Sequence, residues 1–419
     1  MASERNQFVD VMRGIAMLLV VLGHTMTGST VGSQDSFLFN IVWSLQMPLF
    51  FLISGYVTRY SRGIDSGVDL LKYIKRRTLA YMLPWFVWSF VVRGIILGMH
   101  DFLNIKWLLW NMDSGYWFLV TIWTICMVYG VSIFIAGTLA KSPGVKQRSI
   151  TLVFYVIGMA GLAGIGLLMG LSFFAIKLTL YYMPFYFAGY LYGQYRDKIF
   201  ETKWGATVID VIVVVCLAFW LFIMTRYHLY ALPDTGIAII LRVASSITGC
   251  IAVCGLCKGL FFNNGVANCK DDTSQLVWEV QPKDMFQPSP AAQSARKCRN
   301  SNDSKYSGNN LDDCKIIANN INEVAYSENV KHKHRIEAKP VWKQRIVNGL
   351  LWAGKYSLGI YMVHGLVLNV LMPETKPIFP SIRGYCLIFV NFIITVLLCV
   401  VIINLIAQSR TLRKILGMR

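Results

Sequence analysis

The stretch RGIAMLLVVLGHTMTG, residues 13–28, is almost wholly apolar, yet it begins with Arg13 and carries His24 inside. An ionisable side chain is costly in the middle of a lipid-spanning helix, which makes His24 a candidate functional residue. Three helical turns separate the two residues, so they share a face roughly 16 Å apart along the axis. Asp10 precedes Arg13 by one turn and is placed to pair with it. Spacing alone leaves two alternatives open for His24, a chemical role or a hydrogen bond to a neighbouring helix.

The composition indicates a polytopic membrane protein. Of the 419 residues, 55% are hydrophobic and only 15% are charged, whereas a soluble domain carries about 25% charged residues. The net charge of +18 could suggest nucleic acid, but the basic residues fall mainly in short segments between apolar runs. They therefore predict membrane topology and attraction to anionic lipid or an anionic cofactor, and no nucleic-acid partner.

Ten apolar runs are long enough to span a bilayer, which needs about 20 residues. The first resembles a signal peptide, but its Arg–His pair argues against that interpretation. The expected fold is all-α, with about ten transmembrane helices. The predicted spans lie near residues 14–34, 37–58, 79–99, 116–138, 150–170, 172–193, 205–225, 236–262, 346–372 and 384–408.

Loop charge sets the expected orientation. The segments after the second, fourth and sixth spans are rich in Lys and Arg, as is the tail, whereas the alternate loops are poor in them. Positive residues mark the cytoplasmic side. Both termini are therefore expected in the cytoplasm of a multi-pass cell-membrane protein.

Residues 263–345 differ in kind from the rest of the chain. They are polar, mixed in charge and poor in apolar residues, a composition that cannot bury enough surface to fold firmly alone. We expect a largely disordered cytoplasmic insert between two parts of one transmembrane domain, residues 1–262 with spans one to eight and residues 346–419 with spans nine and ten and a basic tail.

Polar residues also recur in the ninth span. His364 lies in GKYSLGIYMVHGLV, with Tyr361 and Ser357 one and two turns before it on the same helical face. Such aligned groups suggest a lined cavity, although Ser and Tyr also bind helices to one another. His364 is expected at a depth comparable to that of His24.

Other basic residues have two interpretations. The stretch LLKYIKRRTLAYMLPW, which contains Arg76 and Arg77, either orients the third span or binds phosphate. Arg93, Lys177 and Arg242 lie near predicted helix ends, where snorkelling to the interface explains them. No metal-binding constellation is expected.

Five segments, in order, resemble the acyltransferase-3 family of integral membrane acyltransferases, particularly its fucose-4-O-acetylase-like and O-acetyltransferase branch. DVMRGIAMLLVVLGH is similar to the opening Arg-x10-His motif and MPLFFLISGY to the second-helix signature. GYWFLVTIW, YYMPFYFAGYLYG and YSLGIYMVHGLV resemble the later motifs. The match runs from residue 5 to about 405, without the insert. No further domain is expected after the tenth span.

The resemblance implies a ten-helix enzyme that moves an acyl group, usually acetyl, from acyl-CoA to a hydroxyl of a carbohydrate or cell-envelope glycan. It implies that His24 is catalytic and that Arg13 and a basic Arg-x-x-Arg pair contact CoA. This chain has Arg77 at the first position of that pair but Ala80 at the second, so Arg76 and Lys75 are the candidates to compensate. Acyl-CoA is then a donor substrate, and no permanently bound cofactor is expected.

In the resulting hypothesis, Arg13, Arg76 and Arg77 hold the phosphates of CoA, and His24 acts as general base or as acyl carrier. Asp10 orients Arg13. Five residues are expected to shape or line the cavity: Trp117, Tyr182, Ser357, Tyr361 and His364. The alternative functions are a transporter or flippase for an anionic or glycan substrate, and a membrane sensor acting through the insert.

Overall fold

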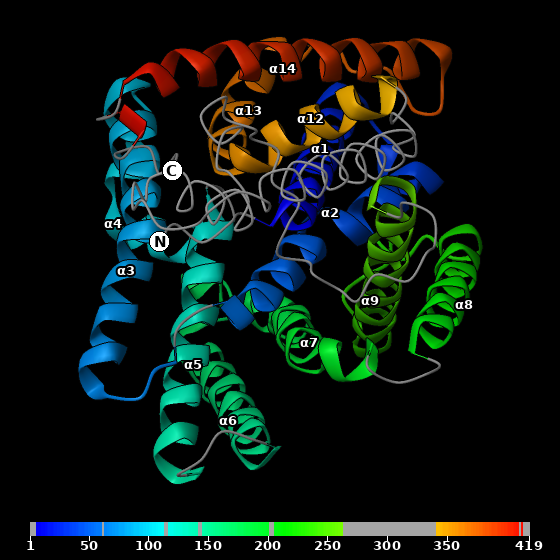
Figure 1. Ribbon diagram of the computed structural model, residues 1–419. Coiled ribbons are helices and arrows are strands. Elements are labelled where there is room, and N and C mark those ends of the chain that lie inside the picture. The colour runs from blue at the N-terminus through cyan, green and yellow to red at the C-terminus, as the bar shows by residue number, and fades with distance from the viewer. Residues whose placement is uncertain are drawn as a thin grey trace, which may run out of the picture. The chain divides into compact units, whose positions relative to one another are not determined.

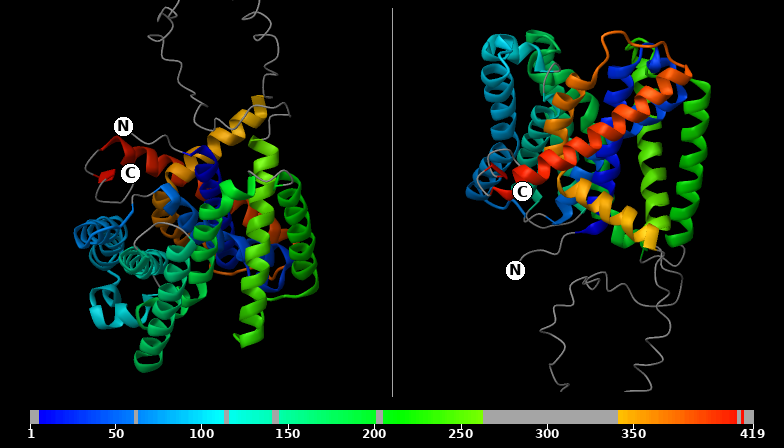
Figure 2. Two further views of the ribbon diagram at one scale, coloured as in Figure 1. Left: turned by 60° about the horizontal axis from the view of Figure 1, so that its bottom comes forward. Right: turned by 90° about the horizontal axis from the view of Figure 1, so that it is seen from above.

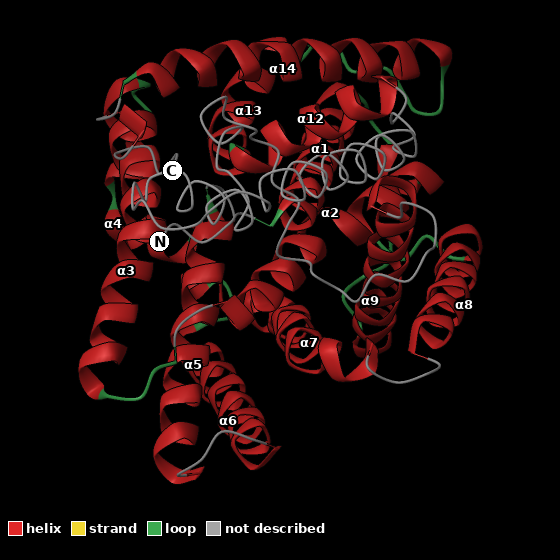
Figure 3. Ribbon diagram, in the orientation of Figure 1, coloured by secondary structure: helices red, strands yellow, loops and turns green. Residues whose placement is uncertain are grey.

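A computed structural model describes residues 6–60, 63–112, 116–140, 145–200, 205–262, 341–409 and 412–413. Regular structure in these residues is helical (Figures 1 and 3), apart from an isolated bridge between Val31 and Ile378. The principal helices are α1 (Gln7–Ser29), α2 (Phe37–Tyr56), α3 (Gly67–Phe86), η3 (Val87–Ile96), α4 (Ile105–Trp110), α5 (Trp117–Ala140), α6 (Val145–Met169), α7 (Ile176–Phe200), α8 (Gly205–Arg226), α9 (Gly236–Cys257), η7 (Lys258–Phe262), α12 (Val341–Lys355), α13 (Ser357–Leu371) and α14 (Ile382–Gln408).

Each predicted span corresponds to a helix or a pair of helices in the described part of the chain. Eight helices there are long and apolar enough to cross a membrane, which confirms the all-α, multi-pass membrane fold. The two other predicted spans correspond to α7, which contains Lys177, several tyrosines and Pro184, and to the shorter helices α12 and α13.

Side-chain caps set several helix starts. Ser36, Ser66 and Ser381 each accept a hydrogen bond from a backbone N–H three residues later, and such a cap satisfies one of the donors that a helix leaves unpaired. Gly170, with φ of 93°, begins the short connection between α6 and α7. The left-handed backbone there suits glycine.

The third span begins about three turns earlier than residue 79, where it was predicted. The basic stretch expected as a loop is the first half of α3, because Ser66 caps that helix and Asp69 occupies its first turn. Beyond Pro84 the helix changes into η3, a π-helix. Proline disrupts regular α-helical hydrogen bonding, and π-helical segments recur at functional sites.

The predicted ninth span, 346–372, is divided at Tyr356, which has non-helical backbone angles. Figure 2 shows α12 and α13 meeting at a marked angle. The break follows a close approach between helices, since a Cβ at Gly354 would collide with the backbone oxygen of Asp10 in α1. The division leaves α13 to carry Tyr361 and His364 by itself.

Helix α2 packs against both α1 and α7. The contact with α7 is very close, because a Cβ at Gly55 or at Gly189 would collide with the backbone of the opposite helix. Small residues allow such approach in membrane helix pairs. This packing holds the second-helix signature against α1.

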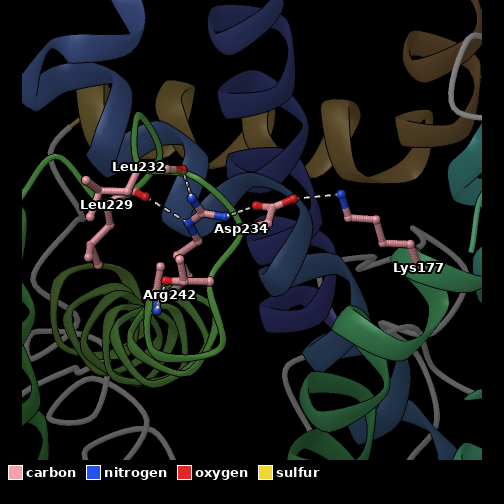
Figure 4. Close-up of polar contacts among 7 residues, drawn as sticks. Lys177, Leu229, Leu232, Asp234 and Arg242 are labelled. Carbon is pink, nitrogen blue, oxygen red and sulfur yellow. Dashed lines mark hydrogen bonds and ion pairs between the residues drawn. The ribbon is translucent and has the colours of Figure 1, made fainter.

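Arg242 and Lys177 do not merely snorkel. Arg242 is 8% exposed and donates to the carbonyls of Leu229 and Leu232 and to the Asp234 carboxylate, which also accepts from Lys177 at 2.6 Å (Figure 4). These bonds fasten the loop between α8 and α9 to the start of α9 and to α7.

Backbone contacts divide the chain into a compact unit, Met1–Asn263 with Trp342–Arg419, and a second unit, Asn264–Val341. The predicted insert, 263–345, lies outside the described residues except for 341–345. Those five residues belong to α12, although their polar composition had placed them in the insert. Every candidate site residue lies in the first unit.

Candidate functional site

His24 lies on α1 between two buried residues, Gly23 and Thr25, but its own side chain is exposed. Protein atoms nevertheless surround the ring on most sides. The Trp43 ring of α2 lies 6.3 Å away between centroids, and the His364 ring of α13 lies 5.2 Å away. His24 therefore lies against α2 and α13 with an exposed side chain, rather than serving only as a buried helix-to-helix contact.

The two predicted histidines are brought together, and the second has a defined tautomer. His364 is buried, and its Nδ1 lies 2.9 Å from the carbonyl oxygen of Ile360. A carbonyl can only accept, so Nδ1 carries the proton. In the neutral ring the lone pair is then on Nε2, which is an acceptor.

Aromatic rings continue from the histidine pair into the bundle. Tyr361 lies 5.9 Å from His364 and 5.5 Å from Phe118, measured between centroids. Trp117 and Tyr182 stack on one another at 5.5 Å with an interplanar angle of 15°. The predicted cavity residues on α5, α7 and α13 thus belong to one aromatic wall.

Ser357 does not join this group directly. It is the first residue of α13 and half-buried, two turns from His364. At 1.5 Å per residue the separation along the helix axis is about 10 Å. The shared helical face predicted from the sequence is present, but Ser357 lies near the α12–α13 break rather than beside the histidines.

A basic cluster forms around Tyr81 near the Arg13 end of α1. Arg13 pairs with the buried Asp10 at 3.8 Å and interacts electrostatically with Tyr81. Arg77 donates to the Tyr81 hydroxyl at 3.4 Å and lies over the Tyr73 ring at 5.2 Å. Two of the three predicted donor-binding arginines therefore converge.

Arg76 does not take part in this convergence. It is exposed, whereas the adjacent Arg77 is half-buried, because successive residues on a helix point about 100° apart. Any contribution of Arg76 is consequently limited to the charge that it adds to the surface of α3.

The sequence interpretation missed Arg93. Its guanidinium lies 4.7 Å over the Tyr116 ring, and the Tyr116 hydroxyl donates to the Met362 carbonyl in α13 at 3.1 Å. Arg93 thus belongs to the wall that holds the His364 helix instead of snorkelling to the interface. Arg93 lies in the π-helix η3. The apolar periodicity of the sequence does not reveal a π-helix, so it could not predict which way the Arg93 side chain points.

The amino-acid sequence matches a known protein family over the helices that carry most of these residues. Residues 6–267 match Acyl_transf_3, a family described as an acyltransferase domain. The chain belongs to this acyltransferase family. The match covers α1 to α9, which include His24 and both convergent arginines, and it ends before the helix that carries His364.

Relatives of this family member include two proteins named nodulation protein NolL. That of Sinorhizobium fredii is 23% identical over 208 residues, 46% of this chain and 50% of the relative. That of Mesorhizobium japonicum is 24% identical over 237 residues, 52% of this chain and 57% of the relative. The chain thus spans about half the length of these curated relatives. No solved structure matches significantly.

Proposed function

We propose that this membrane acyltransferase-family protein moves an acyl group, most simply acetyl, from acyl-CoA to a hydroxyl of a carbohydrate or cell-envelope glycan. The observation that carries the proposal is the accessible His24 inside the helix bundle, with His364 beside it at 5.2 Å. Membership of the acyltransferase family supports acyl transfer as the reaction. The identities of the acyl donor and of the acceptor are what we propose.

On the donor side, Arg13 and Arg77 bind the phosphates of CoA. They share Tyr81 as a neighbour, and they lie on the chain segment that loop charge assigns to the cytoplasm. Charge-assisted hydrogen bonds from guanidinium to phosphate are strong and directional. The pantetheine arm then extends along α1 for the three turns that separate Arg13 from His24.

At the reaction centre, a neutral His24 takes the proton of the acceptor hydroxyl as its oxygen attacks the thioester carbonyl carbon. The C–O bond forms, the C–S bond breaks, and the thiolate of CoA leaves and receives the proton. An acyl-histidine that passes the acyl group on in a second step satisfies the same balance. Both routes need an unprotonated His24.

The aromatic wall gives this chemistry a water-poor setting. Trp117, Tyr182, Phe118 and Tyr361 are rings in mutual contact, and apolar surroundings strengthen electrostatic interactions with the reacting groups. Excluding water also limits hydrolysis of the thioester. In this proposal the acceptor hydroxyl approaches His24 from the side away from the cytoplasm.

The decisive experiment uses the purified protein in detergent or vesicles with labelled acetyl-CoA and candidate glycans. We expect acceptor-dependent CoA release and labelled glycan from the wild type, and loss of both in His24→Ala. The matched control is His100→Ala, an exposed histidine at the start of the short 3-10 helix His100–Leu103, which should retain transfer. Full activity of His24→Ala would overturn the catalytic assignment.

Mass spectrometry of surface glycans from cells with and without the gene would identify the acceptor and the acyl chain together. Transport of a glycan without time-dependent release of CoA would favour a transporter instead. That outcome would contradict the proposed reaction as a whole.

A further inference from the structure

Gln46 of α2 is a buried amide without a hydrogen-bond partner in the described part of the chain. The residue is only 4% exposed, and its Oε1 is fully buried and unpaired. Leaving a buried polar group unsatisfied costs about 1–3 kcal/mol, so an unpaired amide in a close-packed helix needs an explanation. Because no hydrogen bond within the described residues engages this amide, its N–H groups are available as donors to a bound ligand.

The place of this amide points to the reaction centre. A Cβ at Gly23 would lie 2.5 Å from Gln46 Oε1, so the glycine before His24 makes room for the amide beside the His24 backbone. Trp43, one turn away on α2, contacts the His24 ring. Because α1 and α2 run antiparallel, Gln46 lies about 4.5 Å nearer than Trp43 to the Arg13 end.

The positions of Gln46 and Trp43 along α2 predict how the thioester of acyl-CoA approaches His24. Acyl-CoA held at Arg13 and Arg77 extends its arm along α1 and reaches the level of Gln46 as it reaches His24. The other polar group at the centre, His364, presents an acceptor at Nε2 because Nδ1 donates to Ile360. A developing negative charge on oxygen needs donors instead.

We propose that the Gln46 side-chain amide binds the thioester carbonyl oxygen and stabilises the oxyanion of the tetrahedral intermediate. The inference rests on the proposed acyl transfer at His24. As the acceptor oxygen bonds to the carbonyl carbon, the C=O π electrons move to oxygen, and the hydroxyl proton moves to His24. The amide N–H donates to that oxygen until C=O re-forms and the C–S bond breaks.

The N–H end of the amide is available to the thioester. Oε1 is the end that lies fully buried against Gly23, and no hydrogen bond within the described residues engages the amide. The N–H groups at the opposite end are therefore unengaged donors. Preorganised donors of this type, including glutamine, act in other acyl-transfer sites.

The test is Gln46→Met, which keeps the length of the side chain and removes the donor. We expect kcat for acyl transfer to fall by about 10²–10³-fold, the effect of losing one oxyanion donor, with KM for acetyl-CoA nearly unchanged. The melting temperature should stay the same or rise, because an unsatisfied polar group is removed. Gln46→Asn, with a withdrawn donor, should give an intermediate kcat.

The matched control is Thr395→Val on α14, since the Thr395 hydroxyl is also buried and unpaired in the described structure. It should retain kcat. A folded Gln46→Met with wild-type kcat would overturn the inference, as would an Asn variant with full activity if the Met variant does not fold. Failure of the wild type to use acyl-CoA would instead contradict the proposed function itself.

Discussion

Tyr81 lies within the electrostatic influence of two arginines from different helices. Arg77 donates to its hydroxyl from one turn away on α3, Arg13 acts on it from α1, and Asp10 pairs with Arg13. Guanidinium groups bind phosphate through charge-assisted hydrogen bonds. Arg77, which contacts Tyr81, is therefore a better candidate for phosphate binding than its exposed neighbour Arg76.

Neutralising these two neighbours should therefore have unequal effects. Arg77→Gln should raise KM for acetyl-CoA by about 10- to 100-fold, corresponding to a lost charge-assisted hydrogen bond of 1.5–3 kcal/mol. Arg76→Gln should change KM less, because its side chain is exposed. Steady-state kinetics at two salt concentrations would measure both, and equal effects would contradict the convergence on Tyr81.

The ion pairs of Asp234 should make the stability of the folded protein depend on pH. Hydrogen bonds from Lys177 and then Arg242 hold the pKa of the Asp234 carboxyl below its usual value. In the unfolded chain this carboxyl has a pKa of about 3.9. The stabilisation of the fold by its ion pairs is therefore complete above that pH and is lost as pH falls through the lower pKa of the folded state.

Asp234→Asn should accordingly melt at a lower temperature than the wild type at pH 7, with a deficit of about 1 kcal/mol or less for a partly exposed pair. The difference should shrink as pH is lowered below 4. Thermal unfolding in detergent from pH 7 to 3 measures this, with the exposed Asp35→Asn as the control. A deficit that persists at the lowest pH would point to packing rather than charge.

Among the elements, α2 connects the parts of the site. Its first half carries Trp43 and Gln46 beside α1, and its other end packs on α7, which carries Tyr182. The contact depends on Gly55 and Gly189, whose missing side chains let the two backbones approach. The geometry of the reaction centre therefore depends on a helix crossing that contains no catalytic group.

A methyl group at this crossing should disturb the whole interface. Gly189→Ala should lower stability by about 1–3 kcal/mol through overpacking and should reduce acyl transfer as α2 shifts. Gly164→Ala on α6 is the matched control, since open space surrounds Gly164 and alanine favours helix. Thermal unfolding and activity of both variants would be compared; equal stability would argue against the close crossing.

At the scale of the whole molecule, the compact unit Met1–Asn263 with Trp342–Arg419 contains every residue to which we assign a role. We therefore expect a protein in which residues 265–338 are replaced by about 20 Gly/Ser residues, a flexible linker, to retain acyl transfer. Activity assays of equal amounts of folded protein would test this. Loss of kcat in a folded variant would give the replaced segment a part in catalysis.

The sequence by itself determined the membrane helices, because the transfer free energy of an apolar run depends only on its own residues. It likewise placed Arg13 and His24 on one helix face. The break at Tyr356 and the π-helix η3 were not predictable in this way, because both depend on contacts with other helices as well as on local composition.

Only the tertiary structure decided which polar residues meet. It placed His364 beside His24, Tyr81 under the electrostatic influence of both Arg13 and Arg77, and the Gln46 amide against Gly23. Nothing in the apolar pattern distinguishes Arg77 from Arg76 or singles out Gln46. Hydropathy reports how each segment partitions into lipid, whereas lateral packing depends on the shapes and hydrogen bonds of segments that are distant in the chain.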